Sequence, residues 1–189
     1  MSTYRKSLGA AFAIALAAGT VSVVAPTASA ATDGSNVVIN EVYGGGGNKG
    51  ATYTHDFVEL YNPTDQEIDL EGWTVDQCAK GGSCHGKATL TGKIPAGGYF
   101  LIQGAQGNGG TKALPSPNHA EDSLTYSGTD AIAYLKDAAG ETIDLVGWGS
   151  ANKSEGTAAP RTTNETSVQR KKDGKDTDNN AKAFFTSDL

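Results

Sequence analysis

Five polar residues between positions 40 and 59 have side chains that could bind a metal ion and activate water. They are Asn40, Glu41, His55, Asp56 and Glu59. Carboxylate and imidazole groups gathered around a divalent cation are typical of metal-dependent nucleases. The alternative is structural, because buried carboxylates commonly anchor backbone or asparagine groups through hydrogen bonds. The structural interpretation is favoured, and a nuclease or nuclease accessory that acts on extracellular DNA is the alternative function.

Two other catalytic chemistries lack their sequence patterns. A serine hydrolase of the nucleophile-elbow type needs G-x-S-x-G, which is missing, and the three histidines, His55, His85 and His119, all fall in predicted loops. The segment "GGGGNKGAT" (44–52) resembles a phosphate-binding loop only superficially, because glycine follows Lys49 where serine or threonine is needed. The sequence therefore predicts no enzyme of either class.

The segment "DGKDTDNN" (173–180) is rich in oxygen ligands. Asp173, Asp176 and Asp178 could bind calcium, which carboxylates favour and which exported proteins meet. The order of residues does not fit the EF-hand loop, however, and no glutamate closes it. Asp and Asn also stabilise turns by accepting hydrogen bonds from their own backbone. A calcium site and a structural turn therefore both stay open; no other cofactor is expected.

A hexapeptide occurs twice, as "IDLEGW" (68–73) and as "IDLVGW" (143–148). Asp69 and Asp144 could form a catalytic or metal-binding pair, but neither has a histidine or second carboxylate at close spacing. The preferred interpretation is two structural corners in which aspartate faces outward and apolar residues face the core. These apolar residues are Ile68, Leu70 and Trp73 in the first copy and Ile143, Leu145 and Trp148 in the second.

The first thirty residues have the pattern of a secretory signal peptide. Arg5 and Lys6 precede an apolar run at 8–24, and "ASA" (28–30) predicts cleavage after Ala30. The alternative, a membrane anchor, is disfavoured because the run is close to the minimum spanning length and ends at a cleavage site. No later segment is apolar enough to span a membrane, so we expect a secreted, extracellular protein.

Both cysteines, Cys78 and Cys84, lie after this leader. In an oxidising compartment an even pair predicts a disulfide. A zinc site or haem attachment site is disfavoured, because their spacing is not that of either motif.

Charge disfavours a nucleic-acid partner. The formal net charge is −6, and loss of the leader makes it more negative because the leader contains basic but no acidic residues. Acidic surfaces repel phosphates. Arg170, Lys171 and Lys172 form a local basic patch within "QRKK", which is interpreted as a solvated loop or strand end. Binding of nucleic acid through this patch is the third hypothesis.

Short strands separated by glycine-rich turns recur along the chain. The expected strands cover residues 37–43, 56–62, the two parts of 68–78, 88–90, 99–103, 131–136, 142–148 and 167–171. Residues 104–123 are expected to form a long irregular loop, and "NAKAFF" (180–185) a packed tail. No segment has a helical period of useful length, so the pattern predicts an all-β sandwich, with a small β-barrel as the alternative.

Most of residues 37–185 resembles the bacterial lamin-tail domains. The resemblance is carried by "VVINEVYGGGGNKGATYTHDFVELYNPTDQEIDLEGWTV", "GGYFLIQG", "IDLVGWG" and "TSVQRKKDGKDTDNNAKAFF". It implies an immunoglobulin-like β-sandwich over residues 37–189, after a leader (1–30) and a polar lead-in (31–36). Cys78 and Cys84 are an addition to the family pattern.

The resemblance implies a binding or targeting module without catalytic activity of its own. The family-pattern positions, expected to be structural, are Asn40, Glu41, Phe57, Glu59, Asn62, Leu70, Gly72, Trp73, Gly147, Trp148, Asp176, Asp178 and Asn180. Loops on a rigid sandwich are common recognition sites. We therefore expect loops 44–55 and 104–123 to engage an unknown protein or cell-envelope partner.

Overall fold

The computed structural model describes residues 34–171 and 174–189. The predicted leader with its cleavage site at Ala30, and the pair Lys172 and Asp173, lie outside the described residues. Strands dominate the described part of the chain, and its one α-helix, α1, has four residues. The prediction of an all-β fold is confirmed.

The strands follow the predicted order, with short additions. They are β1 (Val38–Tyr43), β2 (His55–Tyr61), β3 (Ile68–Asp69), β4 (Thr74–Ala79), β5 (Cys84–Thr89), β6 (Lys93–Ile94), β7 (Tyr99–Gln106), β8 (His119–Ala120), β9 (Ala131–Lys136), β10 (Thr142–Trp148), β11 (Thr166–Arg170) and β12 (Phe184–Asp188), and α1 spans Asn180–Ala183.

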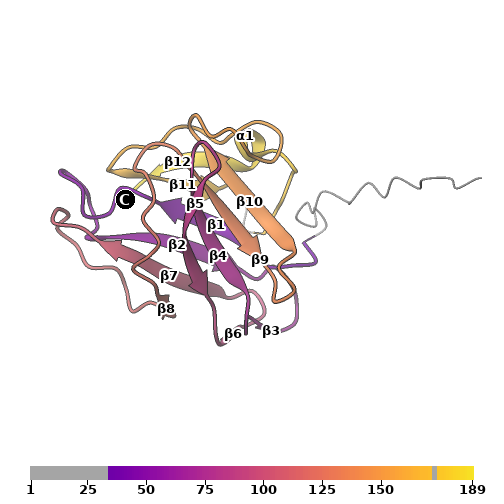
Figure 1. Ribbon diagram of the computed structural model, residues 1–189. Coiled ribbons are helices and arrows are strands. Elements are labelled where there is room, and N and C mark those ends of the chain that lie inside the picture. Colours follow the sequence, from indigo (N-terminus) through magenta and orange to yellow (C-terminus); the bar gives the residue numbers. More distant parts are fainter. Residues whose placement is uncertain (1–33, 172–173) are drawn as a thin grey trace, which may run out of the picture.

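Two large sheets stack face to face (Figure 1). The six-stranded sheet has the order β12-β11-β1-β2-β7-β8, and the four-stranded sheet has the order β10-β9-β4-β5. A small β3-β6 pair forms a third, two-stranded sheet. Both large sheets have open edges and do not close into a barrel. The fold is therefore an immunoglobulin-like β-sandwich, and the barrel alternative is wrong.

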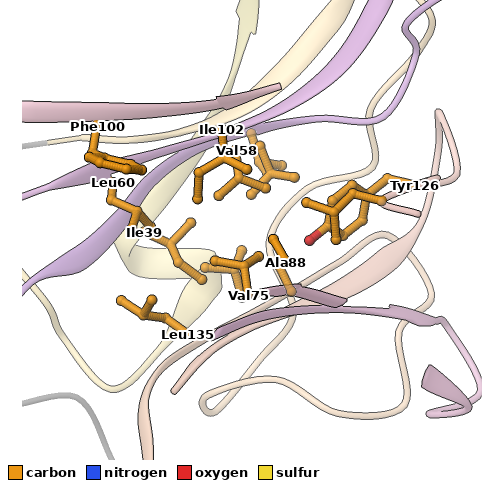
Figure 2. Close-up of a cluster of buried hydrophobic side chains, with 14 of the residues drawn as sticks. Ile39, Val58, Leu60, Val75, Ala88, Phe100, Ile102, Tyr126 and Leu135 are labelled. Carbon is orange, nitrogen blue, oxygen red and sulfur yellow. The ribbon is translucent and has the colours of Figure 1, made fainter. Parts of the chain in front are cut away.

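The core fills the space between the two large sheets (Figure 2). Strand alternation supplies it: Val58 and Leu60 of β2 point inward and are fully buried, whereas Glu59 between them points outward. Val75 and Leu135 contribute from the opposite sheet. Because both inner faces are apolar over several strands, burial of this surface is the main stabilising term.

The two copies of the hexapeptide have different structures. In the first copy Leu70 is buried and Asp69 is exposed, as predicted, and Gly72 turns the chain with φ of 77°. The second copy lies entirely within β10, and a bulge between Thr142 and Asp144 shifts its register. Asp144 therefore points inward and is fully buried. The prediction of a second corner with an outward aspartate is wrong.

The bulge also changes the apolar residues of the second copy. Val146 and Trp148 share the inward face with Asp144, and both are buried. Leu145 lies on the other face and is only half-buried, so its predicted position in the core is wrong. Ile143 packs against the core from a half-buried position.

Two smaller expectations also need correction. His55 begins β2, His85 lies in β5 and His119 in β8, so the histidines are not in loops. The segment 104–123 is not wholly irregular, because β7 continues to Gln106 and β8 pairs with it in parallel.

Within the described residues there is no helix long and apolar enough to cross a membrane.

The disulfide links the two strands of the β4–β5 hairpin next to its turn. Cys78 of β4 and Cys84 of β5 are cross-strand partners and are bonded through their sulfur atoms. The bond closes the glycine-rich turn at 80–83. The predicted disulfide is thus present, at one end of the four-stranded sheet.

The C-terminal segment packs as expected, but as regular structure. Asn179 caps α1 by accepting a hydrogen bond from the Lys182 backbone N–H at 3.2 Å. The chain then enters β12, which pairs with β11 at the edge of the larger sheet. Ala183 and Phe184 are buried in the core. This arrangement places residues 174–180 beside β10 and β11.

Candidate functional site

A row of paired residues crosses the outer face of the six-stranded sheet. Cross-strand register places Phe185, Gln169, Glu41, Glu59 and Leu101 side by side on five adjacent strands. Directly paired residues of a sheet point to the same face. Two carboxylates are therefore neighbours at the middle of this face, with an apolar side chain at each end of the row.

A pocket of about 170 Å³ lies at this acidic pair. It is called the acidic pocket below. It is lined by Glu41, Tyr53, Phe57, Glu59, Leu101, Leu114, Pro115 and Leu189. Tyr53 comes from loop 44–55, whereas Leu114 and Pro115 come from the 107–118 connection. The two segments that were predicted to carry recognition therefore meet at one pocket.

Aromatic packing positions the apolar side of the acidic pocket. The Tyr53 and Phe57 rings are 6.1 Å apart in an edge-to-face arrangement, and Tyr43 contacts both. The Tyr43 hydroxyl donates to the Asn164 carbonyl at 2.6 Å, which fixes the orientation of the Tyr43 ring. Loop 44–55 is thereby held against the sheet.

Hydrogen bonds hold the two carboxylates in place. Glu41 accepts from the Ser167 hydroxyl at 2.5 Å, and Glu59 accepts from the Asn40 amide at 2.9 Å. Burial raises the pKa of Glu41; the Ser167 hydrogen bond opposes this, and the nearby Glu59 charge adds to it. These hydrogen bonds support the structural interpretation of Glu41 and Glu59. A positive charge brought into the pocket would stabilise the ionised form of both carboxylates.

Asp56 and His55 belong to a different environment. The Asp56 oxygens accept from the backbone N–H groups of Gly46 and Tyr126, each at 2.8 Å, so this side chain joins two loops. Burial raises the pKa of Asp56 to about 7, while both backbone hydrogen bonds oppose the shift. His55 is hydrogen-bonded to Thr54 through Nδ1. Neither residue lines the acidic pocket.

The carboxylates of the nuclease alternative do not converge on a metal-binding arrangement. Over residues 34–171 and 174–189, three or more His, Cys, Asp or Glu side chains come close enough for a metal only at Glu155, Asp176 and Asp178. Glu41, Asp56 and Glu59 are not such a group. The alternative of a metal-dependent nuclease at these residues gains no support.

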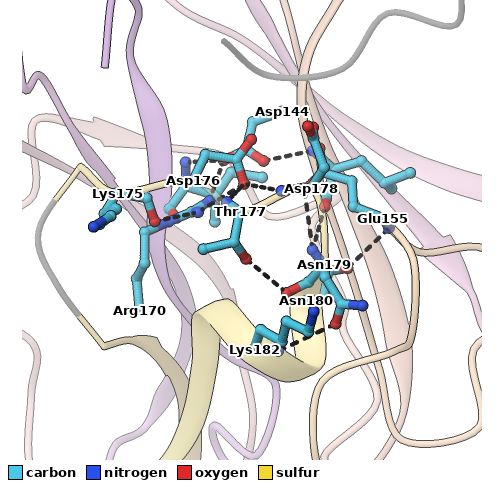
Figure 3. A network of polar contacts seen from close by, with 12 residues as sticks. Asp144, Glu155, Arg170, Lys175, Asp176, Thr177, Asp178, Asn179, Asn180 and Lys182 are labelled. Atoms are coloured by element: carbon cyan, nitrogen blue, oxygen red, sulfur yellow. Dashed lines mark hydrogen bonds and ion pairs between the residues drawn. The ribbon is translucent and has the colours of Figure 1, made fainter. Parts of the chain in front are cut away.

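A buried ionic network lies between the two sheets near the C-terminus (Figure 3). The Arg170 guanidinium donates to Asp144 at 2.6 Å and to Asp176 at 3.3 Å, and all three side chains are buried. It also donates to the Ile39 carbonyl and lies over the Phe184 ring. The interpretation of Arg170 as part of a solvated basic patch is wrong, because alternation with core residue Val168 turns it inward.

The network carries a burial cost that its hydrogen bonds offset. Burial raises the pKa of Asp144, whereas the Arg170 charge and the Ile39 backbone N–H lower it. The Ile39 N–H donates to Asp144 at 2.7 Å, which links β1 of one sheet to β10 of the other. The side chains of this network act in structure and are not accessible to a nucleic acid.

Other family-pattern residues also act as structural anchors. The buried Asn62 side chain donates to the carbonyls of Gln66, Ile94 and Pro95 and accepts from the Thr64 backbone N–H at 3.0 Å, so it organises the turn after β2. Asn180 does the same near β10: its amide donates to the Leu145 carbonyl, and its oxygen accepts from Gly147 N–H.

Sequence reasoning missed several members of these sites. Glu155 is distant in sequence from Asp176, and no local motif signals their contact. Tyr53, Leu114 and Pro115 lie in loops without periodicity, so their convergence was not predictable. The inward position of Arg170 could have been found, because Val168 and Arg170 are two residues apart on one strand.

Fold and site together define an immunoglobulin-like β-sandwich module. Comparison with known protein families matches residues 30–150 to the Lamin Tail Domain. The match covers more than half of the chain, and the chain belongs to this family. No match was found among curated proteins.

Proposed function

We propose that this chain is an exported, non-catalytic binding module that engages a protein or cell-envelope partner through the acidic pocket. The observation that carries the proposal is the meeting of two recognition loops at a pair of adjacent carboxylates, Glu41 and Glu59. Membership of a non-enzymatic family supports the lack of catalysis.

The pocket suits a cationic group that carries apolar neighbours. Within the described part of the chain, no lysine or arginine forms an ion pair with Glu41. A lysine or arginine side chain from a partner would place its charge at the carboxylates and its methylene groups against Phe57, Leu101 and Pro115. Such a contact combines charge complementarity with burial of apolar surface.

The surface around the pocket extends the contact area. Tyr99 and Phe185 are 43% and 38% exposed, which is unusual for large apolar side chains. Tyr61 stacks on Tyr99 with ring centroids 4.7 Å apart. These rings lie on the same outer face as the acidic row, so a partner seated on the pocket would also meet aromatic surface.

Export is supported by two observations. The N-terminal sequence has the pattern of a cleaved leader, and the Cys78–Cys84 disulfide suits an oxidising compartment. The partner is accordingly sought outside the cell. Asn40, Glu41, His55, Asp56 and Glu59 have structural hydrogen bonds or separate environments, so the nuclease alternative is not adopted.

Co-sedimentation of the purified protein with the envelope fraction of the producing cells tests this function. We expect the wild-type protein to sediment, and the double variant Glu41→Gln, Glu59→Gln to bind at least ~10-fold more weakly, a difference of about 1.4 kcal/mol. Excess lysine-rich peptide should release the wild-type protein. Glu71→Gln, an exposed residue outside the pocket, is the matched control. Equal binding of the double variant and wild type would refute the proposed site.

A further inference from the structure

Three carboxylates converge near α1, and none of them lines the acidic pocket. Oxygen atoms of Glu155, Asp176 and Asp178 lie within 4.8 Å of one another. They are called the carboxylate cluster below. Asp176 and Asp178 come from the turn before α1, and Glu155 comes from the loop after β10 (Figure 3). The loop and the turn are fastened together, because the Asn180 amide donates to Glu155 at 3.1 Å.

The two oxygens of Asp176 have different environments. Oδ1 accepts from the backbone N–H groups of Thr177 at 2.7 Å and Asp178 at 3.2 Å, and from Arg170. Oδ2 is buried and accepts no hydrogen bond from any of the described residues, and the whole residue is only 2% exposed. A buried carboxylate oxygen without a partner is costly, and it points to a ligand that supplies positive charge.

Local charge favours the same ligand. Arg170 is shared between Asp144 and Asp176, so it balances at most one of these two carboxylates. Glu155 and Asp178 add two further negative charges at the cluster. Four carboxylates thus lie in and beside the cluster, and Arg170 is the one fully buried lysine or arginine among the described residues.

We propose that the carboxylate cluster binds one divalent cation of the calcium type. All available ligands are carboxylate oxygens, which are hard ligands and suit calcium or magnesium rather than zinc or copper. Loop residues at irregular spacing favour calcium, because magnesium demands near-ideal octahedral geometry. Glu155 is an addition to the predicted calcium site, and Asp173, which was part of that prediction, lies outside the described residues.

The cation would join two segments that come from different parts of the chain. The loop after β10 carries Glu155, and the turn that delivers α1 and β12 to the sheet carries Asp176 and Asp178. Binding would stabilise the folded state, since the unfolded chain holds these residues apart. Extracellular modules typically bind calcium with Kd of about 10⁻⁴ to 10⁻³ M.

Calcium titration of the full protein, freed of metal by a chelator, tests the site. We expect one calcium per chain by calorimetry and a rise in Tm of a few degrees (~3–6 °C) in 10 mM calcium relative to chelator, with a smaller effect of magnesium. Glu155→Gln and Asp178→Asn should each abolish the rise. Both side chains are at least partly exposed, so these variants should fold.

The control variant is Asp65→Asn, which removes an exposed carboxylate from a remote turn. It should keep the calcium-dependent rise in Tm. An unchanged Tm of the wild-type protein in calcium, or an equal rise in Glu155→Gln and Asp178→Asn, would overturn the proposal. The second result would mean that calcium binds only diffusely to an acidic surface.

Discussion

The carboxylate of Asp144 and the guanidinium of Arg170 lie 2.6 Å apart, and both side chains are completely buried. Asp144 belongs to the four-stranded sheet and Arg170 to the six-stranded sheet. Their ion pair therefore connects the two layers of the sandwich through the core. The bulge after Thr142, which turns Asp144 inward, is what makes this contact possible.

The first prediction concerns the loss of one partner of this pair. Arg170→Met should lower the free energy of unfolding by about 3–5 kcal/mol at pH 7, because Asp144 would be left charged and buried. The loss should be smaller at pH 5. Burial then raises the pKa of Asp144 without an opposing charge, and protonation removes the cost. Urea unfolding at both pH values measures the effect.

A second variant separates the ion pair from general damage to the core. Asp144→Asn keeps an acceptor for the Ile39 N–H and removes the charge. The double variant Asp144→Asn, Arg170→Met should therefore lose less stability than the sum of the two single losses. Strict additivity would contradict the interpretation of Asp144 and Arg170 as a coupled pair.

The second prediction concerns pH dependence at Asp56. Its pKa is about 7 in the folded protein and about 4 in the unfolded chain. Between these values the folded state binds more protons, so the contribution of Asp56 to stability falls as pH rises from 4 to 7. The Asp56→Asn variant should lack this contribution. The difference in unfolding free energy, wild type minus variant, should then decrease by a few kcal/mol (of the order of 2–4) over that range.

Thermal or urea unfolding of both proteins at several pH values provides this difference. Asp65→Asn is the matched control, since its side chain is exposed. A difference between wild type and Asp56→Asn that stays constant from pH 4 to pH 7 would show that the two backbone hydrogen bonds hold Asp56 ionised throughout.

The third prediction compares the glycines of the two hexapeptides. Gly72 has φ of 77°, and an added Cβ would lie 3.3 Å from the Ala138 Cβ, so Gly72→Ala should cost about 1–2 kcal/mol from backbone strain. At Gly147 a Cβ would lie 2.0 Å from the Lys153 carbonyl oxygen. Gly147→Ala should therefore cost more, about 3 kcal/mol or above, because the loop after β10 must move. Equal losses in urea unfolding would be inconsistent with these two separate roles.

The fourth prediction concerns catalysis. Supercoiled plasmid incubated with the purified protein and magnesium or calcium should stay intact and unshifted on a gel, as it should with EDTA. Glu41, Asp56 and Glu59 have separate environments, and Arg170 is buried, so neither a nuclease centre nor the full basic patch is available. Nicking that EDTA and Glu59→Ala both abolish, with the variant folded, would make this chain an enzyme.

Strand order and core were largely predictable from alternation. Val58 and Leu60 flank the outward Glu59, and this period of two directly predicts a half-buried strand. The same reasoning failed at β10, because a bulge after Thr142 shifts the register by one residue. A bulge of this type depends on the neighbouring strand β9 and leaves no local sequence signal.

The sites were harder to predict than the fold, because they depend on contacts between distant segments. Glu41 and Glu59 could be placed together once their strands were expected to pair. Pro115 and Tyr53 reach the same pocket through loops, for which no periodicity exists. Glu155 meets Asp176 only because the loop after β10 folds back toward α1.

Strand β1 is the first strand of the described chain, yet one of its two neighbours, β11, begins only at Thr166. The middle of the larger sheet therefore joins residues more than a hundred positions apart, as in Glu41 and Gln169. Such a topology has a high contact order and folds slowly, because a long loop must close before these contacts form. We expect a nascent chain of this kind to stay unfolded until its C-terminal residues emerge. A chain that is still unfolded is thin enough to thread through a translocation channel, as the proposed export requires.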